Sequence, residues 1–166
     1  MNFKYLSLLI IALSIFSSCT KEELEYTGND LNKELVAIPI GSHTAIETEL
    51  FDLINNHRVS IGLNELTFDN TTYYYAGQHN KYMISQNKIS HDKFVERAKN
   101  VTKKTGAAHV AENVARNYNS MQMVFEAWLD SQSHRRALEG NYSHSAINIT
   151  ETVEGNLYFT QMFYRK

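Results

Sequence analysis

WLDSQSHR, residues 128–135, is the stretch around which the rest of the chain can be placed. On a helix of 3.6 residues per turn, Val124, Trp128 and Ser131 fall on one face, at positions i, i+4 and i+7. A hydroxyl group is therefore in line with the only tryptophan of the chain. This pattern is unusual for a helix that only covers a surface, and it predicts a pocket with polar groups beside the core.

Other residues supply what such a pocket needs. Ser133 is a candidate N-cap, which predicts that the helix breaks there and restarts, so that His134 swings back over the pocket. His91, preceded by a serine, adds a second imidazole, and the string AENVA at residues 111–115 adds the carboxyl group of Glu112. The candidate site thus draws on three separate segments.

The composition indicates one globular domain. The chain has 166 residues, of which 43% are hydrophobic, enough to bury one sizeable core. The formal net charge is −2, and no basic run provides a match for a phosphate backbone. We therefore expect no nucleic-acid partner.

The N-terminus is a separate unit that is typical of a bacterial lipoprotein signal. Residues 6–16 form an apolar run that is shorter than the roughly 20 residues of a spanning helix, which predicts a signal peptide over residues 1–18. The run leads through two serines into Cys19, the only cysteine, and this resembles a lipoprotein cleavage site. The resemblance implies a mature protein anchored to the membrane through acylated Cys19. The alternative is an ordinary secretory signal with an incidental cysteine.

The segment that follows predicts a flexible tether, residues 19–43. It is polar and contains the only proline of the chain, Pro39. Its Lys-Glu-Glu string, residues 21–23, resembles the export signal that sends some lipoproteins to the outer face of the bacterial outer membrane, although charge clusters are more often solvated tethers. With Cys19 acylated, no thiol remains for a disulfide, so packing and hydrogen bonds must hold the domain.

Hydrophobic periodicity predicts helices, one internal strand and a C-terminal hairpin. Asp69 is a plausible cap of the second helix, and the weaker third helix is expected to turn Phe94, Val95 and Ala98 inward. Helices followed by a hairpin indicate an α/β sandwich with a largely antiparallel sheet. The expected helices span residues 44–62, 70–86, 92–103 and 120–131, and the expected strands span residues 110–115, 145–150 and 157–164.

Six short motifs occur in order within residues 49–163. They are LINxxR (53–58), AxxHxxxM (76–83), SH (90–91), ENVA (112–115), WxxSxxHR (128–135) and YFTQxF (158–163). Each is weak alone, but together they resemble the bacterial, SCP-like branch of the CAP superfamily, which includes cysteine-rich secretory proteins, insect antigen 5 and plant pathogenesis-related proteins. The resemblance implies a three-layer α-β-α sandwich with a small, mostly antiparallel sheet over residues 44–166.

The resemblance also implies a central cavity lined by two histidines and two glutamates. His91 matches the first histidine, Glu112 the first glutamate and His134 the second histidine. Ser131 stands where the second glutamate is found in other branches, so one of the two carboxylates is missing. Asn148 is a further departure, because relatives tend to have glycine in this strand, and we expect it to alter the packing beside the cavity.

These residues are compatible with a metal site or with a polar cluster. Two imidazoles and a carboxylate match the ligands of a catalytic-type zinc site, with His91, Glu112 and His134 around Zn²⁺ or another divalent cation. Ser131 would then orient a bound water. The alternative is a hydrogen-bonded cluster in which Glu112 fixes an imidazole tautomer. The ligands are scattered and lack the tight spacing of a metalloprotease helix.

Function remains open between binding and hydrolysis. Ser131 and His134 are three residues apart, and Glu112 could orient the histidine in a serine-type peptidase, but no glycine-rich nucleophile turn is present. A metal-dependent hydrolase would use the same cavity. We favour a binding module. The resemblance implies an extracellular role with a lipid as one ligand class, and the tyrosines at residues 73–75, which place rings on several helix faces, add a glycan or a peptide.

Overall fold

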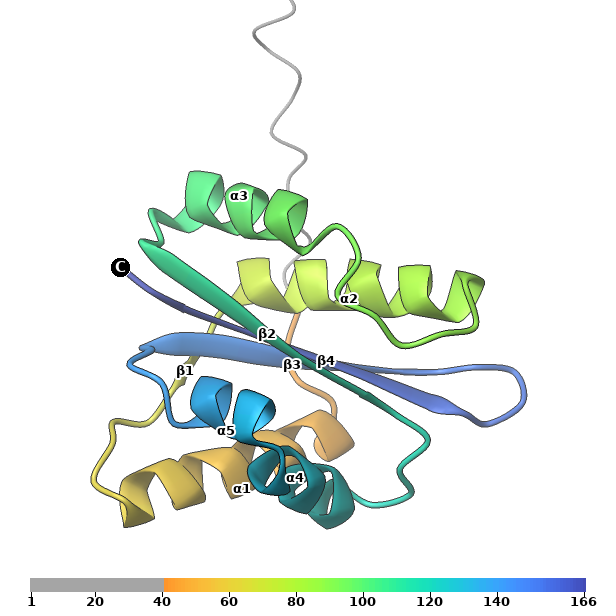
Figure 1. The fold of residues 1–166 in the computed structure, drawn as a ribbon, viewed down its shortest axis with the longest axis horizontal. Helices are drawn as coiled ribbons and strands as arrows, with labels where there is room; N and C mark the ends of the chain where they lie inside the picture. The colour runs from red at the N-terminus through yellow and green to blue at the C-terminus, as the bar shows by residue number, and fades with distance from the viewer. Residues whose placement is uncertain (1–40) are drawn as a thin grey trace, which may run out of the picture. The chain divides into compact units, whose positions relative to one another are not determined.

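The computed structural model describes residues 41–166 (Figure 1). The predicted signal peptide, Cys19 and nearly all of the predicted tether lie outside the described residues. None of the described helices is long and apolar enough to span a membrane. Within residues 41–166 the helices are α1 (Ala45–Ser60), α2 (Asn70–Ser85), α3 (Phe94–Thr105), α4 (Met121–Asp130) and α5 (Gln132–Leu138), and the strands are β1 (Thr67–Phe68), β2 (His109–Arg116), β3 (His144–Glu151) and β4 (Leu157–Arg165).

The strands form one sheet in the order β1-β3-β4-β2. β4 pairs with both β3 and β2 in antiparallel fashion, with Ile147 opposite Gln161 and Glu112 opposite Met162. The predicted hairpin and internal strand are thus confirmed. The sequence pattern does not predict β1, which pairs in parallel with the start of β3. Because β1 has two residues, it is too short to produce a periodic signal.

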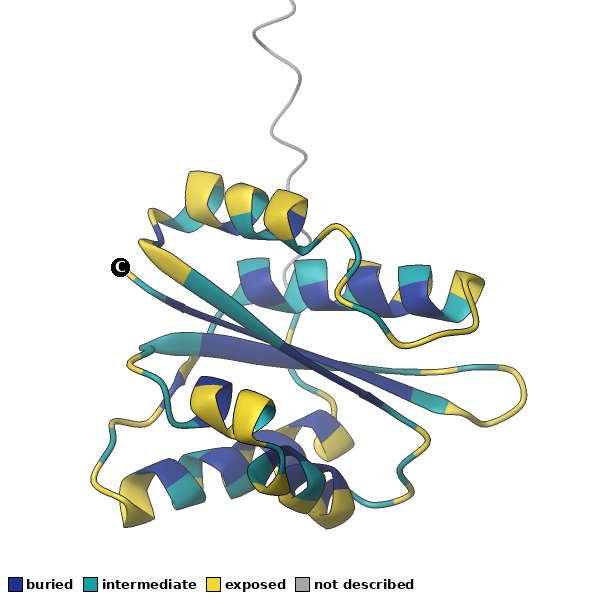
Figure 2. Cartoon of the chain, viewed as in Figure 1, coloured by how far each residue is buried: buried dark blue, intermediate teal, exposed yellow. Residues whose placement is uncertain are grey.

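Helices cover both faces of this sheet (Figure 1). α2 and α3 lie over one face, and α1, α4 and α5 lie over the other. Most of the sheet and the inner sides of the helices are buried, whereas the outer sides of the helices are exposed (Figure 2). The expected three-layer α-β-α sandwich is therefore confirmed. The larger core cluster, on the α1 side, includes Leu50, Ile54, Val124, Trp128, Leu138 and Phe163.

Three helices begin at residues that cap them. The Thr44 side chain accepts a hydrogen bond from the backbone N–H of Glu47, and the Glu47 carboxylate accepts from the N–H of Thr44, which is a capping box. Asp69 caps α2 and Ser120 caps α4, each through a backbone N–H three residues further on. α1, α2 and α4 therefore begin within one residue of the predicted positions.

The break between α4 and α5 comes earlier than the sequence predicts. Ser131 has an extended backbone, with φ −82° and ψ 115°, and α5 begins at the next residue. The expected break at Ser133 is therefore wrong by two residues. Since Ser131 lies outside the helix, its side chain does not continue the face of Trp128.

The expected inner face of α3 is also wrong. The helix begins at Phe94 rather than residue 92, because Lys93 adopts a left-handed conformation with φ 60°. Val95 is 66% exposed, and Phe94 and Ala98 are only partly buried. Arg97 and Val101 are the buried residues of the helix, and Arg97 pairs with the buried side chain of Glu112 in β2.

Side chains from the start of the domain cap the edge of β3. Beyond β1, the backbone N–H of Ile147 donates to His43 Nε2 (3.0 Å) and that of Ile149 donates to Glu47 Oε1 (2.7 Å). Exposed edge groups invite pairing with another chain, so these contacts protect the edge. His43 belongs to the segment expected as tether, yet it also packs edge-on against Phe68 at 4.7 Å between ring centroids.

A fully buried arginine ties α1 to the segment after α5. Arg58 is 0% exposed, and its guanidinium is satisfied mainly by backbone oxygens. Burial lowers the pKa of Arg58, but an arginine keeps its charge at any ordinary pH. The accepting carbonyl oxygens belong to Asn64 (2.9 Å), Leu138 (2.6 Å), Gly140 (3.0 Å) and Tyr142 (3.3 Å).

Asn148 packs between β3 and α2. Its side-chain oxygen accepts from Asn80 Nδ2 (3.0 Å) and from the hydroxyl of Thr150 (2.9 Å). It lies against Gly77 of α2, where an added Cβ would come within 3.3 Å of Asn148 Cγ. The glycine expected in this strand is thus replaced by an amide, and a glycine on the facing helix provides the space.

Candidate functional site

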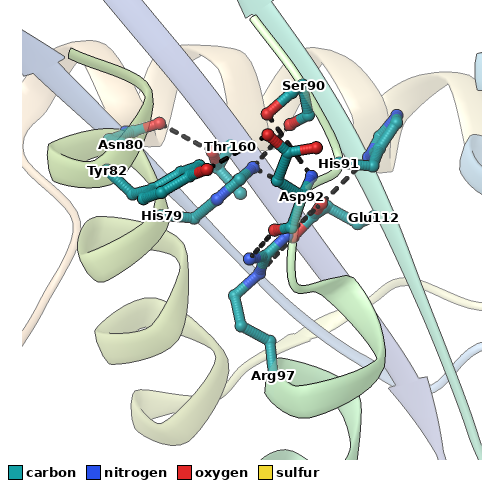
Figure 3. A network of polar contacts seen from close by, with 9 residues as sticks. All are labelled: His79, Asn80, Tyr82, Ser90, His91, Asp92, Arg97, Glu112 and Thr160. Atoms are coloured by element: carbon teal, nitrogen blue, oxygen red, sulfur yellow. Dashed lines mark hydrogen bonds and ion pairs between the residues drawn. The ribbon is translucent and has the colours of Figure 1, made fainter. Parts of the chain in front are cut away.

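Glu112 is the centre of a buried polar cluster between β2, α2 and α3 (Figure 3). It lies in β2, and its side chain is 1% exposed. Arg97 binds it through two hydrogen bonds, from Nε to Oε2 and from Nη2 to Oε1, each 2.8 Å long. Arg97 Nη1 also donates to the carbonyl of Asp92 (2.6 Å). Bidentate, charge-assisted pairs of this kind hold both partners in place.

His91 joins the cluster from the loop between α2 and α3. Its Nδ1 lies 2.9 Å from Glu112 Oε1. Because an ionised carboxylate can only accept, Nδ1 carries the proton. The His91 side chain is 51% exposed, in contrast to the buried carboxylate that it contacts. His91 is therefore the member of the cluster that a ligand can reach from solution.

His79 of α2 closes the buried side of the cluster. Its side chain is 0% exposed, and its Nε2 donates to the carbonyl of Ser90 (2.6 Å) and lies 3.7 Å from Glu112 Oε1. Burial lowers the pKa of His79 despite the opposing effect of Glu112, so the ring is neutral with its proton on Nε2. Its Nδ1 is buried without a hydrogen-bond partner among the described residues. His79 thus holds the loop that carries His91.

The cluster keeps Glu112 ionised. Burial alone would raise the pKa of Glu112, but hydrogen bonds from His91 and Arg97, together with the charge of Arg97, outweigh burial and lower it. Both carboxylate oxygens are then engaged by cationic or polar hydrogens. A lowered pKa makes a carboxylate a weaker proton acceptor, so Glu112 is poorly suited to act as a general base.

His134 lies in α5, which belongs to the layer on the other face of the sheet. Its backbone carbonyl accepts from Asn113 Nδ2 of β2 (3.0 Å). Its Nδ1 is buried, with no hydrogen-bond partner within residues 41–166. Burial, and secondly the charge of His91, lower the pKa of His134. The two imidazoles are therefore within electrostatic range of each other.

Ser131 does not join the cluster. Its hydroxyl lies 3.1 Å from Ser133 Oγ, at the junction of α4 and α5. The structure thus brings His91 and Glu112 into direct contact. His134 lies close enough to His91 for the charge of His91 to lower the pKa of His134.

The arrangement does not fit a three-ligand metal site. Within the part of the chain that the structure describes, no group of three or more His, Cys, Asp or Glu side chains is placed to hold a metal ion. Arg97 occupies both oxygens of Glu112 and puts a positive charge where a cation would have to bind. His91 uses Nδ1 on the same carboxylate. The contacts resemble the predicted polar cluster more than the predicted zinc site of His91, Glu112 and His134.

Sequence reasoning missed Arg97, which is the strongest partner of Glu112. One signal was available, because Phe94, Arg97 and Val101 are spaced i, i+3 and i+7 and so share a helix face. A buried acid also requires a buried base nearby. His79, the histidine of the AxxHxxxM motif, is buried and hydrogen-bonded through Nε2 to the carbonyl of Ser90.

Comparisons with known proteins identify a family. Residues 51–163 match the family model described as CAP, cysteine-rich secretory protein family. The chain is 32% identical over 136 residues to the uncharacterized membrane protein YlbC of Bacillus subtilis, covering 74% of this chain and 35% of that protein. It is 27% identical over 129 residues to the uncharacterized protein YkwD of the same organism, covering 75% and 49%. The chain thus spans at most about half the length of these curated relatives.

Solved structures share the fold. An outer surface protein from Borrelia burgdorferi is similar with a TM-score of 0.67 and 22% identity, over 75% of this chain and 96% of that one. An extracellular protein with an SCP domain from Bacillus anthracis is similar with a TM-score of 0.63 and 26% identity, over 76% and 45%. Since the family model also covers most of the sequence, the chain belongs to the cysteine-rich secretory protein family, the CAP family.

Proposed function

We propose that this chain is a cell-envelope lipoprotein whose CAP domain acts as an extracellular binding module. The observation that carries the proposal is the pairing of Arg97 with both oxygens of Glu112 at 2.8 Å. The contacts lower the pKa of this carboxylate, which makes it a weaker base, and the carboxylate orients His91 at the surface. The half-exposed imidazole can then contact a ligand from solution.

A hydrolase that uses the same cavity is the alternative, and it has less support. Serine-type catalysis needs a hydroxyl that is hydrogen-bonded to a base. The Ser131 hydroxyl is paired with Ser133, and Nδ1 of His134 is without a partner in the described region. A metal-dependent hydrolase needs ligands with free lone pairs, whereas Arg97 engages Glu112. Both forms of catalysis would require the cluster to rearrange.

Attachment to the membrane through Cys19 is part of the same proposal. The short apolar run that ends in two serines and a cysteine supports it. One relative is named a membrane protein, and one structural neighbour is named an outer surface protein. The ligand would then come from outside the cell, and a lipid, a glycan and a peptide are the classes to consider.

Fatty-acid labelling tests the anchor. Cells that express the full chain are fed an alkyne-tagged palmitate, and the protein is then isolated. We expect label in the wild type and none in Cys19→Ala, with surface proteolysis of intact cells removing the labelled protein. An unlabelled wild type, or equal labelling of both proteins, would contradict the lipoprotein proposal.

Turnover assays test the binding module against the hydrolase. The mature protein with Cys19→Ser is incubated with peptide and ester libraries, with and without Zn²⁺. We expect no turnover above a heat-treated control. Turnover that disappears in Glu112→Gln and in His134→Ala would overturn the proposed binding role in favour of catalysis.

A further inference from the structure

Two hollows lie on either side of α2 and share part of their walls. The first, of about 340 Å³, lies between α2 and α3, and the second, of about 360 Å³, lies between α2 and β3. Tyr74 and Gln78, one helical turn apart, border both hollows. We call this pair of hollows the α2 groove. Each is at the small end of the roughly 300–1,000 Å³ range of ligand sites.

Aromatic rings form much of the α2 groove. Tyr74, Tyr75 and Tyr82 line the first hollow, and Tyr73 and Tyr74 line the second. All four tyrosines are partly exposed. The rings of Tyr74 and Tyr75 meet edge to face at 5.1 Å, and Lys93 Nζ lies 5.1 Å from the centre of the Tyr82 ring. Rings that neighbours hold in place offer flat apolar faces to a ligand at low entropic cost.

The rest of the lining is polar with a small net positive charge, because Lys81 is the one charged residue among those that line the second hollow. In the first hollow, Lys93 and Glu96 carry opposite charges. The charge of Arg97, which also lines this hollow, is neutralised by Glu112. Gln78 brings an amide that can both donate and accept hydrogen bonds. Such a surface lacks the strong field that attracts phosphates, but it can satisfy hydroxyl groups.

We infer that the α2 groove binds a neutral oligosaccharide. Sugar rings have flat C–H faces that stack on tyrosine and a rim of hydroxyls that pair with amides, and the α2 groove offers both at Tyr74 and Gln78. An acyl chain could pack on the rings but would make no hydrogen bond with the exposed Gln78 amide. The inference rests on the proposed function and names its ligand class. It assigns the ligand to a surface beside the Glu112 cluster rather than to the cluster itself.

Calorimetric titration tests this assignment. The mature protein with Cys19→Ser is titrated with neutral hexasaccharides of glucose, mannose, xylose and N-acetylglucosamine, and with hexagalacturonate as a charged arm. We expect at least one neutral hexasaccharide to bind. Tyr74→Ala and Gln78→Ala should each weaken that binding about tenfold or more, whereas Tyr74→Phe, which keeps the ring, should stay within about threefold.

Tyr118→Ala is the matched control, because Tyr118 is partly exposed and lies outside the α2 groove. It should bind as the wild type does, and a thermal melt of each variant separates lost binding from lost folding. The inference is overturned if no neutral hexasaccharide binds, if only hexagalacturonate binds, or if Tyr74→Ala binds as the wild type does. Those outcomes leave the proposed function standing, since that proposal fails through the labelling or the turnover test and not through this titration.

Discussion

Arg58 and Arg97 are both buried, on opposite faces of the sheet, and they do different work. Arg58 of α1 is 0% exposed and donates to backbone carbonyls of Leu138 and Gly140. Arg97 of α3 is 8% exposed and donates to the carboxylate of Glu112. Backbone carbonyls accept hydrogen bonds from a guanidinium but do not neutralise its charge. A carboxylate partner accepts hydrogen bonds and also neutralises the charge.

The difference between the two arginines separates fold from function. The Arg58 contacts join α1 to the turn after α5, so they stabilise one layer of the sandwich. The Arg97 contacts hold a carboxylate whose other partner, His91, is half exposed. A buried arginine that binds backbone carbonyls therefore stabilises the fold, whereas one that binds a carboxylate also sets the charge of a site. The following predictions test that contrast.

The largest expected effect comes from Arg58→Leu. Without the guanidinium, the carbonyls of Leu138 and Gly140 are left unpaired, so the free energy of unfolding should fall by about 4 kcal/mol. Urea unfolding followed by Trp128 fluorescence measures the loss. The control Arg135→Leu, at an exposed position of α5, should change stability by less than about 0.5 kcal/mol. A loss below about 1 kcal/mol for Arg58→Leu would contradict the claim that Arg58 stabilises the fold.

A double-mutant cycle tests whether Arg97 and Glu112 act as a pair. Glu112→Gln and Arg97→Met should each lower the free energy of unfolding by about 2–3 kcal/mol, because each leaves a buried charge without its partner. The double variant should lose at least about 1 kcal/mol less than the sum of the single losses. Additive losses would show that the two side chains do not act as one unit.

His43 extends the comparison to a partly buried base that can lose its charge. Its Nε2 accepts from the N–H of Ile147, which requires a neutral ring, and burial lowers its pKa from 6.5 to about 4. Because the folded pKa is below the unfolded one, this stabilisation is complete above pH 6.5 and is lost as the pH falls towards 4.

Between those pH values the wild type should lose about 1–2 kcal/mol more stability than His43→Gln, a figure discounted for the partly exposed ring. Urea unfolding at a series of pH values measures both proteins. Parallel pH profiles would mean that His43 does not titrate on unfolding.

The smallest expected effect is that of Zn²⁺. If the charge of Arg97 keeps cations from Glu112, excess Zn²⁺ should move the melting temperature by less than about 1 °C in both the wild type and His91→Ala. Differential scanning fluorimetry measures this shift. A larger stabilisation of the wild type that His91→Ala abolishes would show that Arg97 yields to a metal, and it would restore the predicted zinc site.

The regular parts of this fold could be predicted from the sequence. Capping residues such as Asp69 and Ser120 mark helix starts, and the alternation in β3 and β4 marks a hairpin, because both signals are local. β1 escaped prediction because it exists only through its pairing with β3. Arg97 was not predicted because a basic residue on a helix usually points to water. Its side chain is buried here because it pairs with a buried acid from another element.

By itself, the sequence determined the family, the order of the helices and of the longer strands, and several of the residues from which a site could be built. It did so because motifs, caps and hydrophobic periods are properties of short segments. Only the tertiary structure decided that Glu112 is neutralised by Arg97, that Ser131 turns towards Ser133, and that His134 belongs to the opposite layer. Those outcomes depend on how α3 is rotated and on which face of β2 each neighbour covers, and both are set by packing between segments far apart in the chain.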